Sequence, residues 1–101
     1  YLVTSREEGG PMGLLESMAS GLPVVSTAVG MAPDVIIDGQ SGGITKDIKA
    51  SLLADKVQSI LLISKNKMNQ QVILNSIKPC TWPVVAQRHL EEVYKPLIYK
   101  L

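Results

Sequence analysis

Cysteine and histidine are nearly absent from this sequence, which contains one of each, Cys80 and His89. A single cysteine excludes a disulfide framework, and two such side chains are too few for a zinc site built from several protein ligands. No apolar run approaches the roughly 20 residues that cross a bilayer, and we expect no signal peptide. We therefore expect a cytoplasmic protein with at most a peripheral contact with a membrane.

Charge of one sign is also lacking. The 10 basic and 9 acidic residues give a formal net charge of +1 and are scattered along the chain. Because no block of like charge is present, we expect no nucleic-acid partner. The 101 residues, 46% of them hydrophobic, suffice for one domain with a single core. The chain opens directly on an apolar stretch at Tyr1, and we expect it to be a piece of a longer protein.

The first part of the sequence predicts a strand, a helix and a second strand. Residues 1–4 are typical of a short buried strand, and residues 23–27 form a β-branched run typical of the next one. Between them, Pro11 suits the first position of a helix and Gly21 suits the left-handed residue just past its end. This β-α-β pattern predicts parallel strands.

The rest of the chain predicts mainly helices, because hydrophobic residues recur there at helical spacing. Asp47 is a candidate N-cap for the first of them. The expected elements are a helical turn at residues 35–37, a strand at 43–45 and helices at 48–64, 68–77 and 82–94. Strands early and helices late predict an α/β domain that ends in helices.

A candidate anion site lies between the first strand and the first helix. In a parallel α/β sheet, ligands bind beyond the carboxyl ends of the strands, where backbone N–H groups face them. Gly9 and Gly10 let the main chain approach a ligand closely, and the first helical turn leaves the N–H groups of Met12 and Gly13 free. A diphosphate fits this arrangement.

Two carboxylates flank this candidate site. Glu16 lies roughly 7.5 Å along the helix from Pro11 and about 140° around it, so it can face a ligand while Leu14 and Leu15 face the core. A carboxylate so placed can accept hydrogen bonds from two ribose hydroxyls. Glu8, on the turn itself, can contact a sugar attached to the distal phosphate.

Residues 5–25, SREEGGPMGLLESMASGLPVV, resemble the signature of the group 1, or family four, glycosyltransferases. The resemblance continues through TAVGMAPDVI at residues 27–36 and DGQSG at residues 38–42, and more loosely through the last helix. It implies that residues 1–101 are the C-terminal part of a nucleotide-sugar-binding domain. That domain would be one Rossmann-like half of a two-domain, GT-B type enzyme.

The resemblance also implies roles for the site residues. In this family the first glutamate, here Glu8, touches the donor sugar and supports charge at the reacting carbon, and the second, here Glu16, holds the ribose. The backbone between them contacts sugar and phosphate, here through Gly9, Gly10, Met12 and Gly13. Many relatives carry an aromatic residue and a glycine where this chain has Gly10 and Pro11. Because Pro11 has no N–H, phosphate binding falls to Met12 and Gly13.

The implied reaction is transfer of a hexose from a nucleotide-diphosphate sugar to an acceptor with retention of configuration. The transition state resembles an oxocarbenium ion, and fixed dipoles and charges stabilise the departing phosphate. The family requires no metal or other cofactor. The implied partners are the nucleotide-sugar donor, an acceptor that the sequence does not identify, and an N-terminal domain of the same protein.

Two other functions stay open from the sequence. One is a nucleotide-sugar-binding module without turnover. The other is a glycosidase that uses Glu8 and Glu16 as acid and nucleophile, against which the phosphate-ready helix start argues. Gly30 and Gly39 are each either an ordinary turn or a sugar-facing loop. For the tail, we expect Trp82 and Tyr94 to be packing residues.

Overall fold

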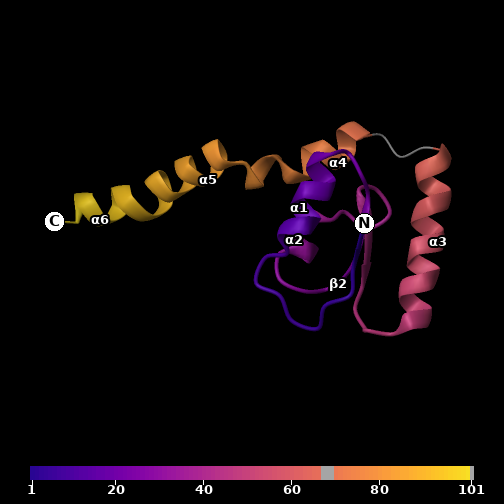
Figure 1. The fold of residues 1–101 in the computed structure, drawn as a ribbon. Coiled ribbons are helices and arrows are strands. Elements are labelled where there is room, and N and C mark those ends of the chain that lie inside the picture. Colours follow the sequence, from indigo (N-terminus) through magenta and orange to yellow (C-terminus); the bar gives the residue numbers. More distant parts are fainter. Residues whose placement is uncertain (67–69, 101) are drawn as a thin grey trace.

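Three short parallel strands form a sheet at the centre of the molecule (Figure 1). The computed structural model describes residues 1–66 and 70–100. The strands β1 (Leu2–Val3), β2 (Val24–Thr27) and β3 (Gly42–Thr45) lie side by side in chain order, and Val25 pairs with Leu2 on one side and Gly43 on the other. The helices are α1 (Met12–Ala19), α2 (Ala32–Val35), α3 (Ala50–Asn66), α4 (Gln70–Ile77), α5 (Trp82–His89) and α6 (Lys95–Tyr99). The predicted α/β class with a parallel sheet is confirmed.

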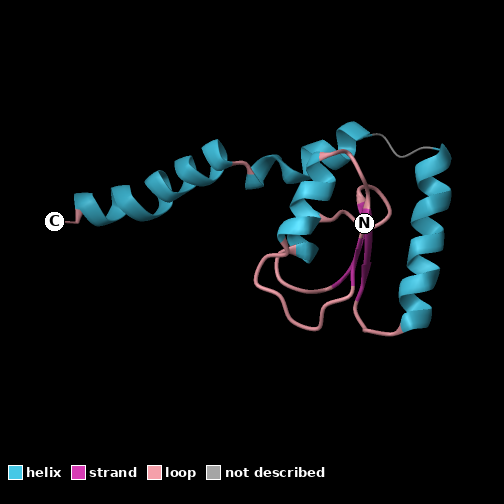
Figure 2. Cartoon of the chain, viewed as in Figure 1, coloured by secondary structure: helices cyan, strands magenta, loops and turns pink. Residues whose placement is uncertain are grey.

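Helices cover both faces of the sheet. Figure 2 shows α1 and α2 on one side and α3 on the other, and α4 packs against α1. Because successive strand residues face opposite sides, Val24 enters the core on the α1 side and Val25 the core on the α3 side. The larger core, on the α1 side, contains the buried residues Val3, Leu14, Met18, Val24, Val29, Ala32, Val35, Ile36 and Ile73.

Helix α1 follows the predicted pattern closely. Leu14 and Met18 are completely buried, whereas Glu16 is exposed. At the C-terminal end, the N–H of Gly21 donates to the Met18 carbonyl at 3.0 Å and the next N–H donates to the Ser17 carbonyl at 3.1 Å. Gly21 has a φ of +76°, as predicted for the glycine that ends this helix.

The sequence misplaced the start of α3 and the position of the short helical turn. Helix α3 begins at Ala50, three residues after Asp47, because residues 46–49 carry the chain from the end of β3 to the other face of the sheet. The turn is α2, which lies earlier than residues 35–37 because Pro33 favours a helix start there. The predicted start of the next helix at Met68 lies outside the described residues, which resume at Gln70 within α4.

Strand β1 is only half buried, contrary to expectation. Val3 is buried, but Leu2 is 49% exposed. Helix α3 packs mainly against β2 and β3, so the α3 face of β1 is left without a helix over it.

The last two helices extend away from the sheet as a tail, which comprises residues 82–99 (Figure 1). A 3-10 turn, η1 (Lys78–Cys80), precedes it, and a π-helical segment, η2 (Leu90–Tyr94), joins α5 to α6. The π-helical geometry of η2 is explained by Pro96, which cannot donate a backbone hydrogen bond and whose ring crowds the preceding turn. Trp82 and Tyr94 are 84% and 55% exposed, so the expectation that they pack is wrong. Among the described residues, none of the helices has the length and hydropathy needed to span a bilayer.

Candidate functional site

The loop between β1 and α1 lies at the carboxyl end of β1. Residues 6–10 are exposed, and Glu8 accepts a hydrogen bond of 2.8 Å from Ser5 Oγ. A Cβ placed on Gly9 would meet no atom within 4 Å, and one on Gly10 would meet only Met31 Cε, at 3.7 Å. The backbone of this loop is therefore open to a ligand, as the glycine pair predicts.

The start of α1 presents unpaired N–H groups beside this loop. Pro11 is the extended residue that precedes the helix, one position earlier than predicted, and its carbonyl accepts from the N–H of Leu14 at 3.1 Å. Within the described part of the chain, the N–H groups of Met12 and Gly13 have no acceptor. The first turn contains no acidic side chain, so no carboxylate of α1 competes there with a bound anion.

Glu16 lies farther along α1, on the side that faces solvent. Its carboxylate has no hydrogen-bond or ion-pair partner among the described residues, whereas the Glu16 carbonyl accepts from Ser20 Oγ at 3.0 Å. The carboxylate is therefore free to accept hydrogen bonds from a ligand. Glu8 and Glu16 make no direct contact with one another, and the first turn of α1 separates them in the chain.

Two cationic side chains lie at the carboxyl edge of the sheet. Arg6 and Lys46 line a hollow of about 170 Å³ together with Ser5 and Thr27. Neither cation has an acidic partner in the described part of the chain. Among the described residues, no group of three or more His, Cys, Asp or Glu side chains is placed to hold a metal ion.

A second loop, residues 28–31, packs against the first, and sequence reasoning did not find this contact. Thr27, at the end of β2, donates from Oγ1 to the Ser5 carbonyl at 2.7 Å. Gly30 has a φ of +50°, and a Cβ built on it would lie 2.7 Å from the Gly9 carbonyl oxygen and 2.8 Å from that of Glu8. The available signal was Gly30 itself, for which the sequence left open an ordinary turn or a sugar-facing loop.

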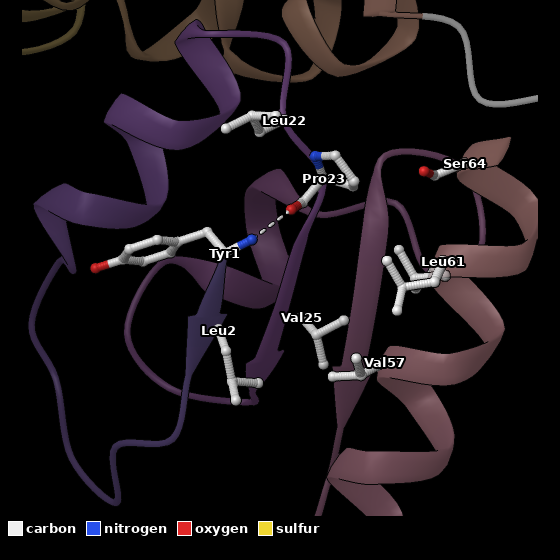
Figure 3. A pocket seen from close by; sticks show the side chains of 9 residues that line it. Tyr1, Leu2, Leu22, Pro23, Val25, Val57, Leu61 and Ser64 are labelled. Atoms are coloured by element: carbon white, nitrogen blue, oxygen red, sulfur yellow. Dashed lines mark hydrogen bonds between the residues drawn. The ribbon is translucent and has the colours of Figure 1, made fainter.

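A large apolar pocket lies outside the two loops, although the Tyr1 ring that lines it reaches Gly13 at the start of α1. It has a volume of about 480 Å³ between β1, β2 and α3, with Leu2, Val25, Val57 and Leu61 on its walls (Figure 3). The terminal amine of Tyr1 donates to the Pro23 carbonyl at 3.0 Å at its rim. Apart from Tyr1, with its phenol and terminal amine, and the Ser64 hydroxyl, the described residues that line it are apolar. The pocket is therefore an uncovered part of the hydrophobic interior rather than a site of chemistry.

Comparison with known proteins places this geometry in a family. The family model for the group 1 glycosyl transferases matches residues 1–78. The chain belongs to the group 1 glycosyltransferases. This membership confirms the resemblance seen in the sequence and the Rossmann-like, GT-B type of fold. The matched region of this glycosyltransferase chain includes the sheet, α1 to α4 and both loops, and it ends before the tail.

Two individual relatives of this chain are also glycosyltransferases. The chain is 33% identical over 81 residues to WcaL of Salmonella typhimurium, which is assigned as a colanic acid biosynthesis glycosyltransferase; the match covers 65% of the chain and 20% of WcaL. It is 30% identical over 95 residues to the D-inositol 3-phosphate glycosyltransferase of Corynebacterium diphtheriae, with 91% of the chain and 22% of the relative covered. The chain thus spans about a fifth of the length of these relatives.

Proposed function

We propose that this chain supplies part of the donor site of a retaining hexosyltransferase that uses a nucleotide-diphosphate sugar. Glu8 contacts the sugar and supports positive charge at the reacting carbon. The N–H groups of Met12 and Gly13 bind the diphosphate, and Glu16 binds the ribose. We further propose that a separate N-terminal domain of the same protein completes the enzyme and binds the acceptor.

The start of α1 carries this proposal. Two backbone N–H groups that have no acceptor among the described residues, Met12 and Gly13, lie beyond the carboxyl end of β1 at the positive end of a helix dipole. Exposed carboxylates stand on either side of them along the chain, Glu8 before and Glu16 after. A ligand with a sugar, a diphosphate and a ribose in sequence has the matching order of groups.

The nearby cations support the same assignment. When the bond between the sugar and the diphosphate breaks, negative charge builds on the leaving phosphate, and fixed positive groups stabilise it. Arg6 and Lys46 have no acidic partner among the described residues and lie at the same edge of the sheet. They add positive charge beside Ser5 and Thr27 at this edge.

The donor-site assignment predicts a specific pattern of nucleotide binding. Titration of the chain with UDP or GDP at millimolar concentration should shift the amide NMR signals of Met12 and Gly13. Glu16→Ala should weaken binding about 10-fold, because it removes charge-assisted hydrogen bonds to the ribose. Glu8→Ala should change it little, because neither nucleotide carries a sugar on its distal phosphate. Glu7→Ala is the matched control, since Glu7 is exposed and has no partner in the described structure.

Turnover separates the enzyme from the other candidates. The full-length protein should release nucleoside diphosphate from a sugar donor, and Glu8→Gln should lower that rate about 100-fold or more, whereas Glu7→Gln should not. If the protein binds nucleotide but releases no nucleoside diphosphate from the donor with any acceptor tested, it is a binding module. Hydrolysis of a glycoside in the absence of nucleotide would identify a glycosidase. The absence of binding to either nucleotide at millimolar concentration would refute the donor-site assignment.

A further inference from the structure

We propose that the loop after β2 is a template that fixes the position of Glu8, and that Ser5, Thr27 and Gly30 are positioning residues for its carboxylate. The template is defined as Thr27 and residues 28–31. This inference rests on the proposed role of Glu8 at the donor sugar.

Backbone contact between the two loops is the first observation. At Gly30 the chain approaches the Glu8 and Gly9 carbonyl oxygens so closely that a side chain could not fit between them. The positive φ of Gly30 is also a left-handed backbone conformation that residues other than glycine rarely adopt. Glycine is therefore required here both for conformation and for space.

A pair of hydrogen bonds that meet at Ser5 is the second observation. Thr27 is 3% exposed and donates to the Ser5 carbonyl at 2.7 Å, and Ser5 Oγ donates to Glu8 Oε1 at 2.8 Å. These hydrogen bonds begin on the central strand β2, where Thr27 lies opposite Thr45 of β3. The exposed carboxylate is thus connected through two hydrogen bonds to the rigid centre of the sheet.

Such a connection is needed because the first loop would otherwise be poorly ordered. Glu8 is followed by Gly9 and Gly10, and adjacent glycines have the largest conformational freedom to lose. A carboxylate that acts on a developing charge must hold its position before the reaction, and a displacement of about 1 Å can cost on the order of 100-fold in rate. The template limits this freedom through its contacts with Ser5, Glu8 and Gly9.

A pair of glycine substitutions tests the template. Gly30 and Gly39 both have positive φ, at +50° and +79°, but a Cβ on Gly39 would meet nothing within 4 Å. Alanine therefore introduces a similar backbone strain at both sites and a collision with the Glu8 loop only at Gly30. In the full-length protein, we expect Gly30→Ala to lower kcat about 10- to 100-fold with a change in donor KM below about 3-fold. Gly39→Ala should stay within about 2-fold of the unmodified rate. Equal kcat values for the two variants would overturn the proposal.

The Ser5 hydroxyl is tested separately, in case Gly30→Ala does not fold. Ser5→Ala should lower kcat about 3- to 10-fold, and Ser5→Thr, which keeps the hydroxyl, should restore it to within about 2-fold. Ser76→Ala is the matched control, because Ser76 Oγ donates to the Val72 carbonyl at 2.8 Å in α4, away from both loops. If Ser5→Ala has no larger effect than Ser76→Ala, Ser5 does not position Glu8 and the proposal fails.

Nucleotide binding and Glu8→Gln distinguish the possible failures. In Gly30→Ala and Ser5→Ala, UDP or GDP should still shift the Met12 and Gly13 amides, because the start of α1 is unchanged. If Glu8→Gln leaves turnover intact, the proposed role of Glu8 fails and the template falls with it. If Glu8→Gln abolishes turnover while Gly30→Ala behaves like Gly39→Ala, the donor site stands and only the template is refuted.

Discussion

Two adjacent glycines in β3 have no room for a side chain, but they differ in the kind of atom that an added Cβ would meet. A Cβ on Gly42 would collide with the carbonyl oxygen of Val24, its partner in β2, whereas a Cβ on Gly43 would meet Lys56 Cγ at 2.5 Å. The Val24 carbonyl cannot move without disturbing the strand pairing. The Lys56 side chain can rotate away, at the cost of its ion pair with Asp38 (3.2 Å), and such exposed pairs are worth about 0–1 kcal/mol.

We therefore expect Gly42→Ala to lower the free energy of unfolding by about 1–3 kcal/mol, as overpacking usually does. Gly43→Ala should lower it by less than about 1 kcal/mol, because the gain in strand propensity offsets the lost ion pair. Urea denaturation followed by far-UV circular dichroism measures both. If the two variants lose the same free energy of unfolding, the Val24 carbonyl can move as readily as the Lys56 side chain, contrary to this prediction.

The same contrast explains what the sequence could tell about single residues. Gly21 was correctly predicted because its role depends on the helix directly before it. The role of Gly30 depends on Glu8 and Gly9, more than 20 residues away, and no local pattern encodes that contact. The loop and helix that carry Glu8 and Glu16 were predictable from the sequence, whereas the contact of this loop with residues 28–31 was not.

Among the elements, the tail contains an ion pair that connects α5 to η2. Arg88 Nε donates to Glu92 Oε1 at 3.1 Å, and this hydrogen bond, together with the charge of Arg88, holds the pKa of Glu92 below its ordinary value. A carboxyl whose pKa is lowered by folding stabilises the helix above its ordinary pKa. That stabilisation is lost as the pH falls through the lowered value.

We expect the Cα chemical shifts of residues 82–99 to become less helical as the pH is lowered from 6 to 2.5. Glu92→Gln should remove part of this change, because it leaves no carboxylate to protonate beside Arg88. Glu7→Gln is the control for a charge change outside the tail. A helical signal that persists unchanged to pH 2.5 would show that the pair contributes nothing to the tail.

Elements encoded by their own residues were predicted better than those shaped by distant contacts. Strand β2 is buried along its whole length, as its β-branched run predicts, and α1 has the expected exposed and buried faces. The burial of β1 was overestimated because it depends on where α3 packs. The start of α3 was missed because it depends on the path around the edge of the sheet, which the local cap signal at Asp47 does not describe.

At the scale of the whole molecule, the tail makes the shape elongated, with extents of 54 × 28 × 17 Å. Its apolar residues are exposed rather than packed on the body, including Leu97 at 60% and Ile98 at 62%. We therefore expect truncation after Thr81 to leave the midpoint of thermal unfolding within about 2 °C, because a loss of 1 kcal/mol would shift it by about 4–8 °C.

Truncation should also weaken self-association, because exposed apolar side chains are removed. Calorimetry measures the midpoint, and sedimentation velocity measures association at matched concentrations. The apolar pocket beside β1 remains in both forms, so the comparison isolates the contribution of the tail. A fall of more than about 4 °C on truncation would mean that the tail packs against the body in solution.

The placement of Trp82 affects how this protein can be followed optically. It is the only tryptophan, and its indole lies in water at the start of the tail, 84% exposed. Its fluorescence should therefore remain that of a solvated indole whether the sheet is folded or not. Burial of the tail against a partner surface would shift the emission to shorter wavelengths. The fluorescence of Trp82 should therefore report docking of the tail on a partner and respond little to unfolding of the sheet.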